Sequence, residues 1–471
     1  MTSVLAGCTP WPEEFVDRYW KAGHWRGNTL DNLLRGWALQ YGARTALVQD
    51  DTRLTYAQLN RRVDRMAAGF RLRGLRPGQR VVVQMPNVPE FVITVFALMR
   101  VGAIPVFCPM PCRGAEVSYL VRITEAAGYV GPSTYQGFDH SAMVADVAAQ
   151  GVFLRRVFTY EAPGTSSPYG GLTIDPTGCH YFPLASVDAP PERPQVRGAE
   201  GVAFFLLSGD STGAENPRLV PRTHNDYAYQ ARAAAELLSL SEDDVYLAAM
   251  PAESNFAFGC PGIIGTFTVG GTVVLVEDPE PEICLTAIGR ERVTVTALEP
   301  TEAQRWLDVL PKAEAEVNSL RLAQLVGGPM QYATGTATAT ATAEGIARVL
   351  GCDVQRLFGM AEGLLTLTRV DDPLDEPEKP TRTTKESRPL SPNDEIRIVD
   401  ANGKETAPGE PGELLTRGPY TIRGYYRAPD HNTRAFTSDG YFRTGVLAMS
   451  TLEGGVVVMG DLETRARPAQ T

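Results

Sequence analysis

The feature that most constrains the fold is a repeated alternation of short apolar strands and apolar or amphipathic helices. Residues 55–69 carry apolar side chains at helical spacing, and residues 80–85 form a β-branched strand. Residues 89–101 read as a second apolar helix, followed by a strand at 103–107. Strand–helix–strand units of this kind place strands in parallel under covering helices. The rhythm returns in two further cycles, at residues 245–276 and 293–326, and predicts an α/β core.

The pattern changes near residue 389 to short alternating segments, which are typical of antiparallel hairpins. Residues 395–399 and 412–416 alternate apolar and polar side chains, with turn residues at 401–403. Since 471 residues are too many for one hydrophobic core, we expect two or three packed subdomains. We predict an α/β core of two intertwined subdomains, a small β-rich subdomain and a residual tail, at residues 1–388, 389–460 and 461–471.

Two segments between these units are harder to assign. Residues 333–343 read ATGTATATATA, which is compatible with a short strand, a weak helix or a partly ordered loop. We predict a mobile surface segment there. A loop rich in Pro and acidic residues, at residues 371–386, is expected to be exposed.

The charge balance excludes several classes of partner. The formal net charge of −11 argues against nucleic acid or an anionic membrane surface as the main partner. No apolar run reaches the ~20 residues that span a bilayer, and the N-terminus lacks the basic start of a secretory signal. We therefore expect a cytoplasmic location. The seven Cys residues are scattered singly and show no complete zinc-ligand spacing, so reduced, mostly buried thiols are expected.

Residues 204–227 read as an apolar strand, a loop of small residues and a basic segment. Small residues let a backbone close around an anion, so such a loop can bind phosphate through N–H and hydroxyl groups. Asp210 lies inside this loop, and its carboxylate would repel a phosphate. The predicted phosphate ligands are Ser208, Ser211, Thr212, Gly213 and Arg218.

This loop and several later stretches resemble the adenylate-forming enzymes, in the branch of the 2,3-dihydroxybenzoate– and salicylate–AMP ligases. The matching stretches include PRTHNDY, LTYAQLNRRVDRMAAGF, LFGMAEGL, RPLSPNDEIRIVD and DGYFRTG. The resemblance extends from Trp11 to Gly460. It implies two α/β subdomains and a small distorted β-barrel, with the active site where the three meet. It also implies a C-terminal lid domain of roughly one hundred residues, which we expect this chain to lack.

The resemblance implies an aryl pocket at residues 251–262. Asn255 matches the residue that contacts the ortho-hydroxyl of the substrate ring, and Cys260 matches a position that is usually Cys in salicylate-type members and Ser in dihydroxybenzoate-type members. A thiol would leave a 3-hydroxyl unpaired, so salicylate-like rings are favoured over catechols. Further substrate contacts are expected at Phe256, Gly328 and Leu357. From the residues alone, without the resemblance, core packing is the preferred interpretation of Phe256, Phe258 and Cys260.

Three acidic or hydroxyl residues are candidates for catalysis. Glu362, in FGMAEG, matches the family's Mg²⁺-associated acid, and a carboxylate is a suitable ligand for that hard cation. The alternative reading is a Glu at a helix start, stabilised by the helix dipole. Ser254 replaces a His of the family, and Glu253 precedes it, so both are candidates for new chemistry.

The nucleotide side departs most from the family pattern. In the family, DGYFRTG is followed by an Asp that binds both ribose hydroxyls, whereas this chain has Val446. Losing such a contact lowers affinity by roughly two orders of magnitude. Arg218 replaces the Lys of the phosphate loop, and the family hinge G-R-x-K-D-Q begins here as GDLET, from Gly460. Arg443 is retained and is a candidate phosphate ligand.

Three hypotheses about function remain open. The first is a degenerate homologue that binds a salicylate-type acid, or its ester or thioester, for ATP-independent chemistry. The second is a working aryl-acid–AMP ligase that uses Mg·ATP and a separate C-terminal domain, and then transfers the aryl group to a carrier thiol or CoA. The third is a non-catalytic protein that binds an aryl intermediate or an aryl carrier protein. Mg·ATP is expected as a cofactor only under the second hypothesis.

Overall fold

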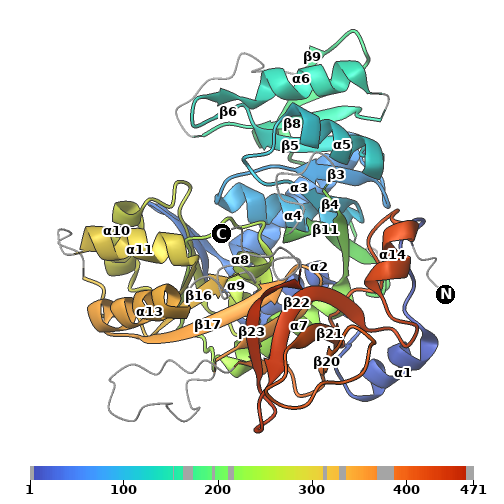
Figure 1. The fold of residues 1–471 in the computed structure, drawn as a ribbon. Coiled ribbons are helices and arrows are strands. Elements are labelled where there is room, and N and C mark those ends of the chain that lie inside the picture. The colour runs from blue at the N-terminus through green and yellow to red at the C-terminus, as the bar shows by residue number, and fades with distance from the viewer. Residues whose placement is uncertain are drawn as a thin grey trace, which may run out of the picture.

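The computed structural model describes residues 5–151, 153–162, 173–193, 197–209, 217–310, 316–327, 336–368 and 387–462. Two large sheets with covering helices adjoin a small antiparallel sheet (Figure 1). The predicted α/β class, with sheets rich in parallel strands, is confirmed. Within the described residues, no helix combines the length and apolarity that a membrane span requires.

The first large sheet has eight strands, and its interior is parallel. The two outermost strands pair antiparallel with their neighbours. In spatial order the strands are β12 (Leu219–Thr223), β11 (Val202–Leu207), β4 (Ile104–Phe107), β3 (Arg80–Val83), β5 (Gly128–Pro132), β8 (Arg156–Tyr160), β10 (His180–Pro183) and β9 (Thr173–Ile174). The helices along this part of the chain are α3 (Tyr56–Leu72), α4 (Pro89–Val101), α5 (Gly114–Thr124), α6 (His140–Gln150) and the short η1 (Leu184–Ser186).

The second large sheet has nine strands, and it is also parallel in its interior. In spatial order these are β19 (Arg388–Pro389), β18 (Leu364–Leu367), β17 (Asp353–Met360), β16 (Leu322–Gly327), β15 (Val295–Leu298), β13 (Val245–Ala248), β14 (Thr272–Leu275), β1 (Thr45–Gln49) and β2 (Thr52–Thr55). Its helices are α7 (His224–Leu237), α8 (Asn255–Gly259), α9 (Gly262–Thr268), α10 (Pro281–Glu291), α11 (Pro300–Val309) and α13 (Thr336–Leu350).

The small sheet is antiparallel. Its strands are β20 (Glu395–Val399), β21 (Gly412–Arg417), β22 (Phe442–Ser450) and β23 (Val456–Asp461). The hairpins predicted at residues 395–399 and 412–416 are therefore confirmed, whereas the proposed domain limits at 388 and 460 remain predictions. The remaining elements are α1 (Glu13–Lys21), α2 (Leu30–Gln40), α14 (Pro429–Ala435) and a two-stranded ribbon of β6 (Thr134–Tyr135) and β7 (Phe138–Asp139).

Local sequence signals explain where the predicted helices begin and end. The Thr55 hydroxyl and the Gln58 side chain form a capping box at the start of α3. Pro89 occupies the first turn of α4, where its missing N–H costs nothing, and Gly102 ends that helix with a φ of 85°. Helix α4 is buried along nearly its whole length, which matches its apolar sequence.

One predicted segment is wrong. Residues 336–343, predicted as a mobile surface segment, form the first turns of α13, while residues 333–335 lie outside the described part. Alternating Ala offsets the weaker helix propensity of Thr. The helix then gains tertiary support, because Ala343, Ile346 and Leu350 pack in an apolar cluster with Trp306. The loop expected at 371–386 also lies outside the described residues.

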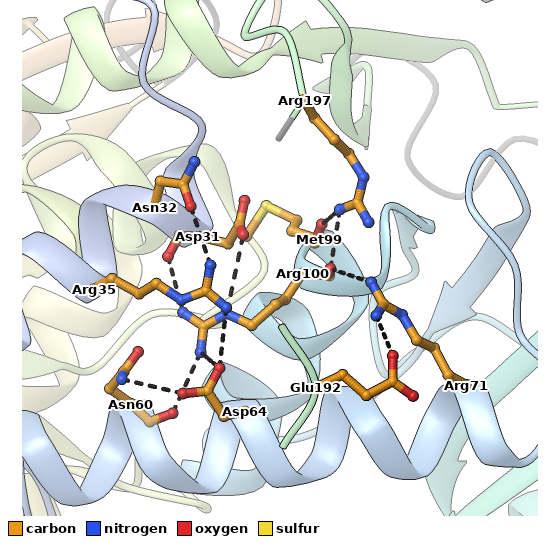
Figure 2. Close-up of polar contacts among 10 residues, drawn as sticks. All are labelled: Asp31, Asn32, Arg35, Asn60, Asp64, Arg71, Met99, Arg100, Glu192 and Arg197. Carbon is orange, nitrogen blue, oxygen red and sulfur yellow. Dashed lines mark hydrogen bonds and ion pairs between the residues drawn. The ribbon is translucent and has the colours of Figure 1, made fainter. Parts of the chain in front are cut away.

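A partly buried network of ion pairs and hydrogen bonds connects the segment before β11 to the helical layer (Figure 2). The Arg197 guanidinium donates to the last three backbone carbonyls of α4, which have no partner within the helix. Arg71 pairs with Glu192 at 2.6 Å, and Arg100 donates to Asp64 at 2.9 Å. Each of these arginines is used by the fold itself, since its partners are backbone or side-chain groups of neighbouring segments.

Candidate aryl-binding and nucleotide-binding cleft

The candidate site lies where the two large sheets meet. Three strands end there: β11 just before Ser208, β13 before the loop that leads to α8, and β17 before Glu362. Side-chain hydrogen bonds join these ends, because Ser208 contacts Glu362 and Asn255 contacts Met360. The main apolar cluster also contains residues of both sheets, so the two sheets share one core. Ligand sites commonly occur at such junctions between subdomains.

Glu362 lies beside Ser208, where the predicted phosphate loop begins. Its Oε1 accepts hydrogen bonds from the Ser208 hydroxyl at 2.5 Å and from the Tyr425 hydroxyl at 2.8 Å, and the residue is only 3% exposed. Glu362 lies in the turn between β17 and β18, so the alternative reading of a helix-start Glu is wrong. Next to it, Gly363 has a φ of 99°, and a Cβ there would lie 1.8 Å from the Tyr420 carbonyl oxygen. The turn that carries Glu362 therefore requires Gly at position 363, and the two hydroxyl donors orient the carboxylate.

Arg222 is fully buried at the end of β12. Its guanidinium donates hydrogen bonds to four groups, one of which is a carboxylate that neutralises its charge. Its Nε donates to Asp226 at 2.9 Å, its Nη1 to the Ala361 carbonyl at 2.9 Å and its Nη2 to Gln230 at 2.8 Å, with a longer contact of 3.3 Å to the Tyr420 carbonyl. Burial raises the pKa of Asp226, although the Arg222 charge opposes that rise. A buried charge needs this many partners to offset its desolvation.

The Arg222 network ends at the predicted ring contact, Asn255. Gln230 Nε2 donates to Asn255 Oδ1 at 3.0 Å, and Asn255 Nδ2 donates to the Met360 carbonyl at 3.2 Å. Helix α7 supplies Gln230, α8 supplies Asn255 and β17 supplies Met360. The structure thus holds the Asn255 amide by both of its polar atoms.

The residues before Asn255 have identifiable local roles. The Ser254 hydroxyl accepts the Ala257 backbone N–H at 3.2 Å and so caps the start of α8. Glu253 is 7% exposed, and burial raises its pKa to about 7, opposed only by the hydrogen bond that its carboxylate accepts from its own backbone N–H. The charge of Glu253 also acts on the nearby thiols of Cys108 and Cys112. The structure therefore places a carboxylate that titrates near neutral pH directly before the aryl-pocket helix.

The predicted apolar ring contacts gather in one cluster. Cys260 and Leu357 are buried together, and Phe256 packs against the same cluster at partial exposure. Burial raises the pKa of the Cys260 thiol, so it stays protonated at neutral pH. Gly328 lies outside the described residues. All seven cysteines are free thiols, and all but Cys8 are buried, as expected.

The structure brings fewer of the predicted nucleotide ligands together. Asp210, Ser211, Thr212 and Gly213 lie outside the described residues. The Arg218 guanidinium lies over the Tyr425 ring, 5.5 Å from its centre.

The two predicted nucleotide ligands on β22 are Arg443 and Val446, and both make contacts that stabilise the fold. The Arg443 guanidinium forms an ion pair with Glu413 of the neighbouring strand. Val446 is 1% exposed and packs in an apolar cluster with Phe358, Ile398 and Leu414. These contacts differ from the phosphate and ribose contacts that the resemblance implies.

Sequence reasoning missed three residues that organise the site: Arg222, Gln230 and Tyr425. A signal for one of them, Gln230, was present, because Asp226 lies four residues before it and the two share one face of α7. Arg222 lies on β12, so helical spacing does not apply to it. Tyr425 has no comparable signal, since it reaches Glu362 from 63 residues away.

Comparisons with known proteins show the family and the fold to which this chain is similar. The model of the family described as AMP-binding enzyme matches residues 34–426. A 2,3-dihydroxybenzoate-AMP ligase of Bacillus subtilis is 40% identical over 458 residues, which cover 97% of this chain and 79% of the ligase. A salicyl-AMP ligase / salicyl-S-ArCP synthetase of Mycobacterium tuberculosis is 40% identical over 97% of this chain and 77% of its own. The apo structure of Mycobacterium smegmatis MbtA superposes with a TM-score of 0.83 at 39% identity, covering 97% of this chain and 80% of that one.

Proposed function

The chain belongs to the AMP-binding enzyme family, and we propose that it binds a salicylate-type aromatic carboxylic acid, or its ester or thioester, without using ATP. The observation that carries the proposal is the contrast around Asn255. The amide is held from both sides by Gln230 and Met360, while Val446 and Arg443 are engaged in packing and in an ion pair. The aryl side is therefore ready for a ligand, and the nucleotide side is not.

Ring selectivity follows from the apolar wall of the pocket. The Cys260 thiol is buried among apolar side chains and remains protonated, so it is at most a weak hydrogen-bond donor. A 3-hydroxyl placed there would lose its water and gain no adequate partner. Asn255 offers the polar contact for an ortho substituent. We propose that 2-hydroxybenzoate-type rings bind better than catechols for this reason.

The described residues do not fit Mg·ATP in full. Enzymes of this family use ATP with Mg²⁺, and Glu362 is suited to hold the cation, but Val446 has no group for ribose hydroxyls and Arg443 is neutralised by Glu413. We therefore assign no step to the nucleotide. Glu253, Ser254 and Glu362 are the proposed groups for ATP-independent chemistry, and a carboxylate with a pKa of about 7 can exchange a proton at neutral pH.

A second candidate is a working aryl-acid–AMP ligase, with an aryl carrier protein or CoA as acceptor. One observation favours it: Glu362 is buried and held by two hydroxyl donors at the entrance to the phosphate-loop region. Such a site is suited to a cation bound beside phosphate oxygens. Under this candidate, adenylation would require other groups to replace the missing ribose contact.

Titration calorimetry of salicylate and of Mg·ATP, in separate experiments on the purified chain, tests the proposal. We expect salicylate to bind and Mg·ATP to show no binding at micromolar concentrations. Salicylate-dependent exchange of labelled pyrophosphate into ATP is the accompanying activity assay, and we expect none above background. Micromolar binding of Mg·ATP together with pyrophosphate exchange would overturn the proposal in favour of the ligase.

A further inference from the structure

We infer that Arg222 and Gln230 fix the orientation of the Asn255 amide, so that the site selects an ortho oxygen on the aromatic ring over an ortho amine. Arg222 and Gln230 act here as positioning residues, since both reach the ligand only through Asn255. The inference rests on the proposed function, because it requires an aromatic acid in the pocket. Beyond that function, it specifies whether the ortho substituent that binds is a hydrogen-bond acceptor or a donor.

The first fixed end of the network is the Arg222 guanidinium. A guanidinium carries only donors, so the Gln230 atom that faces Arg222 Nη2 at 2.8 Å must be the amide oxygen. The Gln230 Nε2 atom then faces Asn255 at 3.0 Å and the Gly259 carbonyl at 3.3 Å. Because this nitrogen donates, the Asn255 atom that meets it must be Oδ1.

The second fixed end is the Met360 backbone carbonyl, which only accepts. It lies 3.2 Å from Asn255 Nδ2, so this end also requires the nitrogen of the amide. Rotating the Asn255 amide by half a turn would place an oxygen against the Met360 carbonyl and a nitrogen against Gln230 Nε2. Both contacts would then be repulsive and both hydrogen bonds would be lost. The two ends therefore select the same orientation.

The donor of Asn255 lies on the more open side of the amide. Its Nδ2 faces Met360, which is partly exposed, whereas Oδ1 faces Gln230, which is fully buried. An amide nitrogen carries two hydrogens, and Met360 receives one of them. Among the described residues, no hydrogen bond uses the second N–H. The pocket consequently presents an N–H donor to a ligand.

An N–H donor at this position should favour 2-hydroxybenzoate over 2-aminobenzoate. In 2-hydroxybenzoate the hydroxyl donates its hydrogen to the neighbouring carboxylate, which leaves oxygen lone pairs to accept from Asn255. In 2-aminobenzoate the amine has a second N–H that points outward, so two donors face each other. A buried polar group left without a partner is strongly unfavourable. We expect 2-hydroxybenzoate to bind at least about tenfold tighter than 2-aminobenzoate.

The test is a Gln230→Met variant, whose side chain has a similar size and no amide. The Arg222 guanidinium retains Asp226 and the carbonyls of Ala361 and Tyr420, so the buried charge stays neutralised. Calorimetry of 2-hydroxybenzoate, 2-aminobenzoate and benzoate gives three dissociation constants for each protein. In the variant the Met360 carbonyl alone orients the Asn255 amide and Oδ1 has no donor, so the preference for one orientation weakens. We expect the ratio between the first two ligands to fall to about threefold or less.

Gln355→Met is the matched control. Gln355 is also buried and takes part in two side-chain hydrogen bonds, with Gln324 and the Thr368 carbonyl, and neither involves Asn255. It should lower the melting temperature as Gln230→Met does and leave the ligand ratio unchanged. A folded Gln230→Met protein that keeps the ratio of the unmodified chain overturns the inference alone. An unmodified chain that binds none of the three acids overturns the proposed function, and the inference with it.

Discussion

The aryl side and the nucleotide side of the cleft use their charged and polar positions differently. On the aryl side, hydrogen bonds connect the buried Arg222 guanidinium through Gln230 to the Asn255 amide, the proposed ring contact. On the nucleotide side, Arg443 pairs with Glu413 at the surface of the small sheet, and Val446 belongs to an apolar cluster. We propose that the first set of residues serves a ligand and that the second stabilises the fold.

This difference has an energetic side. A buried ion pair is highly sensitive to the loss of one partner, because the remaining charge stays desolvated. A surface pair such as Arg443–Glu413, whose arginine side chain is 40% exposed, contributes at most about 1 kcal/mol. Substitutions on the aryl side should therefore change stability and binding together. Substitutions on the nucleotide side should change stability according to packing alone.

The largest effect is expected from Arg222→Met. Its removal leaves Asp226 buried without its cation and should lower the free energy of unfolding by about 3–5 kcal/mol. Salicylate binding should also weaken, because Gln230 loses the donor that orients it. Urea unfolding and calorimetry measure the two quantities.

Arg100→Met is the control for that variant. Arg100 is also buried and paired with Asp64, but its network ends at helix termini and the segment before β11 (Figure 2). We expect a comparable loss of stability with salicylate affinity unchanged in the protein that remains folded. Equal losses of affinity in both variants would remove the distinction between a network that serves the ligand and one that serves the fold.

Val446→Asp tests the nucleotide side directly, since it restores the acid of the family pattern. A carboxylate among Phe358, Ile398 and Leu414 lacks a partner there and should lower the free energy of unfolding by roughly 3–4 kcal/mol. We expect no gain in Mg·ATP binding, with Val446→Ala as the control for lost packing. A tenfold or greater gain in ATP affinity would mean that this side is a nucleotide site lacking one contact.

The sequence predicts the scaffold better than it predicts the contacts within the site. Periodicity identified α4 and the strands around it because apolar spacing depends on neighbours along the chain. The same reasoning missed α13, because alternating Thr and Ala has no apolar face until residues 343–350 are included. Family motifs indicated Asn255 and Glu362, but not that Gln230 and Tyr425 hold them, since hydrogen bonds between distant segments depend on tertiary packing.

Glu253→Gln should remove a dependence of stability on pH. The pKa of Glu253 is about 7 in the folded chain against an ordinary value of 4.5. Between these values the unfolded chain has lost its proton and the folded chain keeps it, so stability falls as pH rises. Below pH 4.5 the two states do not differ, and above 7 the penalty is constant. The variant should gain about 3 kcal/mol relative to the unmodified chain across this window.

Unfolding free energies at several pH values measure this gain, and Asp394→Asn provides a comparison. Asp394 is half-buried, and burial of its carboxyl group raises its pKa from 3.8 to about 7. It accepts a hydrogen bond from the Tyr420 hydroxyl just before the small sheet, so Asp394→Asn should remove a pH dependence that begins near 3.8 rather than 4.5. An unchanged pH profile in Glu253→Gln would show that this carboxylate ionises as it does in water.

The smallest effect is expected from Ser254→Ala, at the boundary between the loop and α8. The hydroxyl caps the helix by accepting the Ala257 N–H, and its loss should lower the free energy of unfolding by about 1 kcal/mol. Ser254→Asn keeps an acceptor and should restore that stability, because Asn is an equally good cap. If the hydroxyl also reacts with a bound ester or thioester, both variants will lose turnover while the Asn variant remains stable. Turnover of salicylate esters that persists in both variants would assign Ser254 to the helix cap and leave Glu253 and Glu362 as the proposed reactive groups on the aryl side.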